Sequence, residues 1–162
     1  MILDALHSVP IVKAIEAWEE AAAEDGKLDR GELTLVIAPT RLRDTCRYLK
    51  EKHGFLRLSG ITAVDHLPKN PRFEIVYHLH SVSNNERLRL KSRLPEENPE
   101  IDSVTGVWRG ADWYEREIYD LFGVKFRGHP NLRRILLPAE WKGHPLRKDY
   151  PIDGYKYSYR EE

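Results

Sequence analysis

The chain has 162 residues, enough for one domain with a substantial core. Lysine plus arginine and aspartate plus glutamate both number 26, so no overall field gathers nucleic acid or anionic lipid, and a charged partner must be met locally. The single cysteine, Cys46, excludes disulfide frameworks, cysteine-based zinc sites and cysteine-ligated iron–sulfur clusters, which all need several thiolates.

The amino-terminal residues 1–4 lack the basic and apolar segments of a secretory signal. The longest apolar runs, such as residues 33–38, are far shorter than the roughly 18 to 20 residues that a membrane helix requires. We therefore expect no direct membrane span, and action at a membrane only through other subunits.

A first helix is predicted to start at Ser8 and Pro10 and to end at Asp25 and Gly26. Its apolar residues fall at three- and four-residue spacing, as on one helix face. They are Ile11, Ala14, Ile15 and Trp18.

A strand is predicted over 33–37, where strand formers cluster. Thr40 then suits the cap of a second helix that ends at Gly54. Leu42, Cys46 and Leu49 would face inward from it.

Residues 55–64 predict another strand, with Gly60 as a bulge or turn. After the proline-rich turn at 68–71, apolar and polar residues alternate over 73–80, which is the period of a strand with one buried face.

Asn84 and Asn85 then turn the chain back into a strand over 87–93, whose exposed face is basic. The two strands form a predicted hairpin. A further short strand is predicted within 101–108.

A third helix is predicted with Asp112 as its cap, Glu115 as the capping-box partner and Gly123 as its stop. Residues 124–162 lose periodicity, because glycine and proline recur at short intervals. Only short pieces of regular structure fit there.

These elements predict an α+β fold in two layers. Two helices cover a mixed sheet of about five strands, followed by a third helix and a long irregular C-terminal tail. We divide the chain into an α+β domain, residues 1–110, and a partner-binding extension with the third helix, residues 111–162.

The third helix brings carboxylates beside aromatic residues. Trp113, Glu117 and Asp120 share one side by spacing, and Tyr114, Ile118, Leu121 and Phe122 share another. In an enzyme, Glu115 or Asp120 with His129, or with His144, would do proton chemistry or hold a metal. The favoured alternative is structural: the acids pair with Arg116, Arg133, Arg134, Arg147 or Lys148 and lock the irregular tail onto the helix.

Metal-binding, phosphate-binding and nucleotide-binding patterns are incomplete in this sequence. His78 and His80 share a strand face, but two histidines are not a ligand set. The basic strand at 87–93 fits phosphate contacts, a solvated face or a protected edge strand. Dinucleotide and phosphate-binding loop spacings do not occur.

After Asp149, the entropy cost of ordering the tail is comparable to the gain from burying its apolar and aromatic side chains. These are Tyr150, Ile152, Tyr155, Tyr157 and Tyr159. We expect a tail that is loose alone and ordered on a partner, with a frayed terminus as the alternative.

Three segments carry a family resemblance: 115–124 followed by Phe126, then 128–136, and then 143–151. They resemble the signature of the C subunit, or 30-kilodalton subunit, of respiratory complex I, the proton-translocating NADH:quinone oxidoreductase. The residues that we assign to the signature and to a partner interface are Trp113, Tyr114, Glu115, Arg116, Glu117, Asp120, Leu121, Phe122, Gly123, Gly128, His129, Pro130, Leu132, Arg133, Arg134, Gly143, His144, Pro145, Leu146, Arg147, Lys148, Asp149, Tyr150 and Pro151.

The resemblance implies a peripheral-arm subunit that binds no cofactor, while the assembled complex uses FMN, iron–sulfur clusters and quinone. It implies packing on the D subunit near the quinone site, contacts with other peripheral-arm subunits, and no nucleic-acid partner. Catalytic, cofactor-binding and metal-binding residues are expected to be none. The implied location is the cytoplasmic face of the bacterial inner membrane.

Two alternatives stay open. Similar C-like subunits occur in F420-dependent, ferredoxin-dependent and hydrogenase-type complexes, and an alternative of another class is a metal- or nucleic-acid-binding module. The end of the chain at Glu162, without a fused D-type domain, favours a stand-alone C subunit.

Overall fold

The computed structural model describes residues 6–154 of the chain. Three helices and seven strands follow one another along this part. They are α1 (Pro10–Trp18), β1 (Ala23–Asp29), β2 (Glu32–Ile37), α2 (Leu42–His53), β3 (Arg57–Asp65), β4 (Phe73–Ser81), β5 (Glu86–Leu94), β6 (Glu100–Asp102), α3 (Ala111–Phe122) and β7 (Lys125–Arg127).

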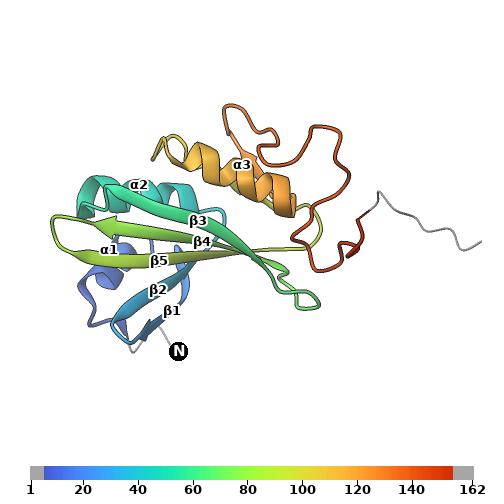
Figure 1. Cartoon of the computed structure of the whole chain (residues 1–162). Coiled ribbons are helices and arrows are strands. Elements are labelled where there is room, and N and C mark those ends of the chain that lie inside the picture. Colours follow the sequence, from blue (N-terminus) through green and yellow to red (C-terminus); the bar gives the residue numbers. More distant parts are fainter. Residues whose placement is uncertain (1–5, 155–162) are drawn as a thin grey trace, which may run out of the picture.

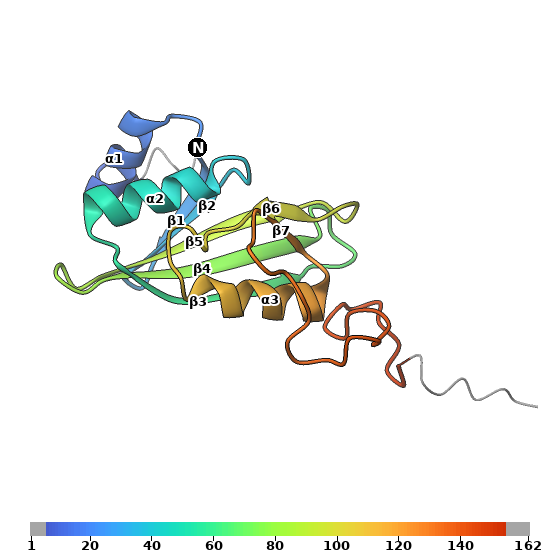
Figure 2. The same ribbon diagram turned by 90° about the horizontal axis from the view of Figure 1, so that it is seen from above.

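The main sheet has five strands in the order β1-β2-β5-β4-β3. Only the β2–β5 pair is parallel, so the sheet is mixed. The helices lie over one face of it, and the C-terminal segment, orange to red, wraps the carboxyl end of α3 (Figures 1 and 2). The predicted α+β fold with an irregular C-terminal tail is confirmed.

One hydrophobic core joins the sheet to all three helices. Alternation along β4 and β5 sends every second side chain toward the helices, as the period of a strand requires. The buried residues on the sheet side are Phe73, Ile75, Tyr77, Leu79, Leu88, Leu90 and Leu94, and on the helix side Val12, Ile15, Leu42, Cys46, Leu49, Ile118 and Phe122. Because α3 belongs to this core, its position is fixed by the sheet.

The predicted end of the first helix is wrong. Helix α1 ends at Trp18, and Asp25 and Gly26 lie inside β1, which the sequence did not predict. This strand is mostly polar and lies at the sheet edge, so it is held by its backbone ladder to β2 and not by an apolar pattern.

The strand predicted within 101–108 is mostly wrong. Only residues 100–102 are extended, and they form β6, which pairs in parallel with β7 in a separate two-stranded sheet. The amides of Val107 and Trp108 both donate to the carbonyl of Val104, so the rest is a turn. The fifth strand of the main sheet is therefore β1.

The predicted start of the first helix is confirmed, since α1 begins at Pro10. The side-chain caps predicted for the second and third helices are wrong, because the capping positions of α2 and α3 are Arg41 and Gly110, and neither makes a side-chain cap bond. The glycine stops are confirmed, since Gly54 and Gly123 adopt left-handed φ values of 70° and 74°. The ladder between β3 and β4 shifts register between Leu58 and Gly60, which confirms the predicted bulge.

Within residues 6–154, no helix has the length and apolar character needed to cross a membrane.

Candidate functional site

The C-terminal segment caps α3. The last carbonyl groups of a helix have no partner within it and must find donors elsewhere. Asp120 O accepts hydrogen bonds from Arg134 Nη1 at 3.1 Å and His144 Nδ1 at 2.9 Å, Leu121 O from Leu146 N at 3.0 Å, and Phe122 O from Arg147 Nε at 2.6 Å. The end of α3 and the segment 134–147 therefore form one hydrogen-bonded unit.

The carboxylate of Asp120 is the centre of this unit. It is fully buried, and Oδ1 accepts from Arg134 Nη1 at 2.6 Å. Oδ2 accepts from three consecutive backbone amides, Ile135, Leu136 and Leu137, at 3.0, 2.8 and 2.9 Å. Burial opposes ionisation, but these donors hold the pKa of Asp120 below its usual range. The charged carboxylate thus fixes the path of residues 134–137.

Arg134 extends the same unit to the next loop. Its Nη2 donates to the carbonyls of Trp141 and Gly143, at 2.9 and 3.0 Å. Arg116, on the preceding turn of α3, donates from Nε and Nη2 to the carbonyls of Arg133 and Arg134. Two guanidinium groups therefore replace the backbone ladder that an irregular segment lacks.

Gly123 allows this close approach. A Cβ atom here would lie 2.6 Å from Arg147 Nη2 and from the His144 ring, and the left-handed φ already favours glycine. Burial lowers the pKa of His144. Its Nδ1 donates to the Asp120 carbonyl, so the neutral ring acts as a fixed donor.

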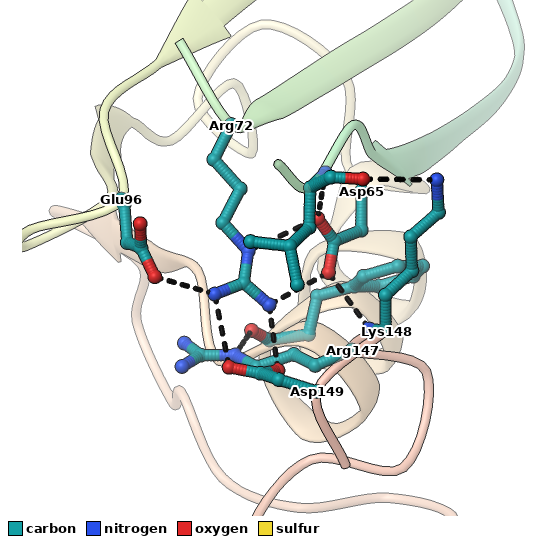
Figure 3. A network of polar contacts seen from close by, with 8 residues as sticks. Asp65, Arg72, Glu96, Arg147, Lys148 and Asp149 are labelled. Atoms are coloured by element: carbon teal, nitrogen blue, oxygen red, sulfur yellow. Dashed lines mark hydrogen bonds and ion pairs between the residues drawn. The ribbon is translucent and has the colours of Figure 1, made fainter. Parts of the chain in front are cut away.

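A second anchor forms around Arg72, which is 1% exposed (Figure 3). All five of its N–H groups donate to carboxylates. Nε and Nη2 reach Asp65 at 3.0 and 2.8 Å, Nη1 reaches Glu96 at 2.7 Å, and Nη1 and Nη2 reach Asp149 at 3.0 and 2.6 Å. The guanidinium thus ties Asp149 in the C-terminal segment to the turn between β3 and β4.

The Asp65 side chain also binds the backbone of the C-terminal segment. Its Oδ2 accepts from the amide of Lys148 at 2.9 Å, and its Oδ1 accepts from the amide of Leu67 at 2.9 Å (Figure 3). Burial opposes ionisation, yet these bonds and Arg72 hold the pKa of Asp65 well below its usual range. No sequence pattern pointed to Asp65, Arg72 or Glu96 as anchoring residues.

Glu115 is buried, and among residues 6–154 no cation pairs with it. Its Oε2 lies 2.6 Å from Ser103 Oγ, and its Oε1 accepts from the amide of Val104 at 2.7 Å. Burial raises the pKa of Glu115 to about 7. This carboxyl joins the 103–105 turn to α3, so it does not make the predicted capping box.

The residues of the enzyme hypothesis are each engaged by a different partner. The His129 side chain is fully buried, where Nδ1 accepts from the amide of Asn131 and Nε2 faces Asp112. Glu115 bonds to the 103–105 turn, and Asp120 is saturated by the C-terminal segment. Glu115, Asp120 and the side chain of His129 are all fully buried.

Within the described range 6–154, no group of three or more histidine, cysteine, aspartate and glutamate side chains is placed to hold a metal ion. The predicted ion-pair role is confirmed for Asp120 with Arg134. Arg116 and Arg147 bind carbonyl groups, and Lys148 reaches the Asp65 carboxylate through its amide.

A family model described as "Respiratory-chain NADH dehydrogenase, 30 Kd subunit" matches residues 35–156. The chain belongs to this family. The C subunit of the NADH-quinone oxidoreductase of Geobacter sulfurreducens is 52% identical over 126 residues, 77% of this chain and 78% of that protein. The corresponding C subunit of Geobacter metallireducens is 47% identical over 145 residues, 89% of each. The predicted resemblance is confirmed.

Two solved structures share the fold of this 30-kilodalton subunit. A trypsin-resistant fragment (1-134) of Nqo5 is 33% identical with a TM-score of 0.64, covering 74% of this chain and 99% of that one. A chain of the membrane-bound sulfane sulfur reductase, an archaeal respiratory membrane complex, is 32% identical with a TM-score of 0.76. That match covers 94% of this chain and 93% of the other.

The structure separates the signature of the 30-kilodalton subunit into two sets. Those inside or partly inside the fold are Tyr114, Glu115, Arg116, Asp120, Leu121, Phe122, Gly123, His129, Leu132, Arg134, Gly143, His144, Pro145, Arg147 and Tyr150. Those exposed are Trp113, Glu117, Gly128, Pro130, Arg133, Leu146, Lys148, Asp149 and Pro151. Trp113, Glu117 and Asp120 therefore do not share one environment. The predicted anchors Tyr155, Tyr157 and Tyr159 lie outside the described residues.

We predict that Asp120→Asn lowers the free energy of unfolding by about 3 kcal/mol, because the amide presents donors to the N–H groups that the carboxylate accepts. Urea unfolding of the full chain measures this. The control is Asp153→Asn, the same change at an exposed position of the C-terminal segment. Equal stability of the two variants would contradict the structural role of Asp120.

Glu115→Gln should change how stability depends on pH. Between the ordinary value of 4.5 and about 7, the folded state holds a proton on Glu115 that the unfolded state has lost. Stability from this group therefore falls as pH rises through that window, by up to about 1.4 kcal/mol per pH unit, and the glutamine variant lacks this slope. Urea midpoints from pH 5 to about 8 measure it. Exposed Glu117→Gln on the same helix is the control, and a wild-type slope in Glu115→Gln contradicts the prediction.

Proposed function

We propose that this chain is the C subunit of a proton-translocating NADH:quinone oxidoreductase. In this role it is a peripheral-arm subunit without cofactors, which packs on the D subunit near the quinone site and supports electron transfer from NADH to quinone. The family match over residues 35–156 supports the choice of complex. The observation that carries the docking role is the attachment of the C-terminal segment to α3 through Asp120.

The attached segment offers a preorganised apolar surface. Trp113 is 62% exposed, Leu136 is 61% exposed and Leu146 is 51% exposed. Arg116 stacks on the Trp113 ring, with Cζ 5.3 Å from its centroid, and also holds the loop before Leu136. Because this backbone is already fixed, a partner gains apolar burial without the entropy cost of ordering it.

In our proposal, the polar residues of the signature act by shaping this surface and not by chemistry. Asp120, Arg134 and His144 are each used in hydrogen bonds within the chain. The flavin, iron–sulfur clusters and quinone would be held by other subunits. Residues 1–110 would serve as the supporting α+β domain, and residues 111–162 as the extension that contacts the D subunit and other peripheral-arm subunits.

We further propose a peripheral location at the cytoplasmic face of the bacterial inner membrane, reached through the other subunits. The relatives named above, which are bacterial subunits of NADH-quinone oxidoreductase, support this location.

A second candidate keeps the docking role but changes the electron donor. The similarity to a chain of an archaeal sulfane sulfur reductase over 94% of this chain favours a C-like subunit of a complex with another donor, such as ferredoxin, F420 or hydrogen. Purifying the complex through a tag on this chain and assaying oxidation of each donor distinguishes the two. NADH oxidation coupled to quinone reduction is the expected result.

Trp113→Ala should weaken docking by about tenfold or more, because a buried tryptophan anchor is worth about 2 kcal/mol at an interface. The yield of D subunit that copurifies with the tagged chain measures this. Val82→Ala is the control, since Val82 is 64% exposed in the β4–β5 turn, away from the C-terminal segment (Figure 1).

Two charge-reversal variants test docking independently. Glu117→Lys on α3 should also lower copurification, whereas Glu51→Lys on the exposed face of α2 should not. Neither should shift the unfolding midpoint. The proposal is wrong if the α3 variants assemble normally, whether or not the assembled complex keeps its electron transfer.

A further inference from the structure

The face of the main sheet away from the helices carries basic side chains on a central strand. β5 is third of five in the sheet and is paired on both sides. Its buried residues alternate with Arg87, Arg89, Lys91 and Arg93. Protection of a sheet edge, one alternative from the sequence, is therefore wrong for this strand.

Strand register brings Arg87 and Arg89 of β5 beside His78 and His80 of β4 and Arg57 of β3, and these five residues are the basic patch. Arg87 lies opposite His80, which lies opposite Arg57, and Arg89 lies opposite His78. The patch borders a hollow of about 250 Å³, lined also by Ser59 and Glu32. This hollow is below the roughly 300 to 1,000 Å³ of cofactor and ligand pockets, so it suits one or two side chains.

The basic patch contains hydrogen-bond donors that have no acceptor among the described residues. Arg89 donates to Glu32 at 2.6 Å and to Thr34 at 3.2 Å. Among residues 6–154, Arg57 and Arg87 have no ion pair or side-chain hydrogen bond, and His80 Nε2 is buried without a partner. Glu32 is the one acidic residue among the described residues that line the hollow, and it pairs with Arg89, so the unpaired Arg57 and Arg87 leave a local surplus of positive charge in a chain of zero net charge.

We propose that the basic patch docks an acidic segment of a neighbouring protein subunit, whose carboxylates pair with Arg57 and Arg87. Bidentate geometry makes carboxylates good partners for guanidinium groups. The size of the hollow suits single side chains and not a row of phosphates, which disfavours a nucleic-acid backbone. By strand register the patch lies on the face of the sheet opposite the helices, whereas the exposed residues Trp113, Leu136 and Leu146 belong to α3 and the C-terminal segment.

The first test titrates the full chain at low ionic strength with a hexaglutamate peptide and follows backbone amides by NMR. Shifts are expected on β3, β4 and β5, and Arg57→Gln with Arg87→Gln should weaken binding about tenfold. The matched control is Arg47→Gln with Arg109→Gln, which changes net charge equally at exposed positions outside both proposed surfaces. No binding, or equal weakening in the control, overturns the proposal. So does tighter binding of an oligonucleotide to the same residues.

The second test uses the assembled complex, with a photoreactive residue replacing Ser59. We expect an adduct with another subunit, mapped to a stretch rich in aspartate and glutamate, and a lower yield in the Arg57→Gln, Arg87→Gln background. An adduct to a stretch without carboxylates overturns the proposal. The absence of any adduct in a complex that assembles also overturns it, but leaves docking through α3 intact.

Discussion

The carboxylate of Asp120 is fully buried at the end of α3, and a buried charge is tolerated only where its oxygens find donors. Four donors come from residues 134–137, three of them consecutive backbone amides. The requirement to satisfy one side chain therefore dictates the conformation of a stretch that has no helix or strand of its own. Arg134, held by the same carboxylate, then passes the constraint to the loop at 141–143.

Arg72 is the second point at which the C-terminal segment is attached to the rest of the fold. One point of attachment would let the segment rotate, whereas two fix its orientation. Asp149 and the amide of Lys148 are held at the β3–β4 turn, far from the Asp120 contacts along the chain. Between the two anchors, Arg134 donates to the carbonyls of Trp141 and Gly143, and Leu146 N donates to a carbonyl at the end of α3. The side chains of His144 and Arg147 donate to two more helix-end carbonyls. A segment rich in glycine and proline is thus ordered by polar contacts, which leaves its apolar side chains Leu136 and Leu146 facing solvent and available to a partner.

The sequence predicted the elements whose apolar period is clear, such as β4, β5 and α2, and the glycine stops that need a left-handed backbone. It did not predict β1, because a polar edge strand is specified by pairing with β2 and not by its own pattern. The predicted capping box does not form because the N-cap of α3 is Gly110 and not Asp112. The Glu115 carboxylate bonds instead to the Ser103 hydroxyl and the Val104 amide. The pair of Asp120 with Arg134 was among those expected from the sequence, and Asp65 and Arg72 lie close in sequence on either side of one turn. The bond between Arg72 and Asp149 could not be predicted, because it joins residues that are 77 apart in sequence and meet only in the folded chain.

The central claim is that the C-terminal segment is folded onto α3 before any partner binds. Hydrogen exchange of the isolated full chain tests this most directly at the amides of Ile135, Leu136, Leu137, Leu146 and Lys148, which all donate within the fold. We expect these amides to be protected to a degree approaching that of β4, and to lose protection in Asp120→Asn. Exchange at the rate of an unstructured peptide in the isolated chain, with protection only in the complex, would contradict the account.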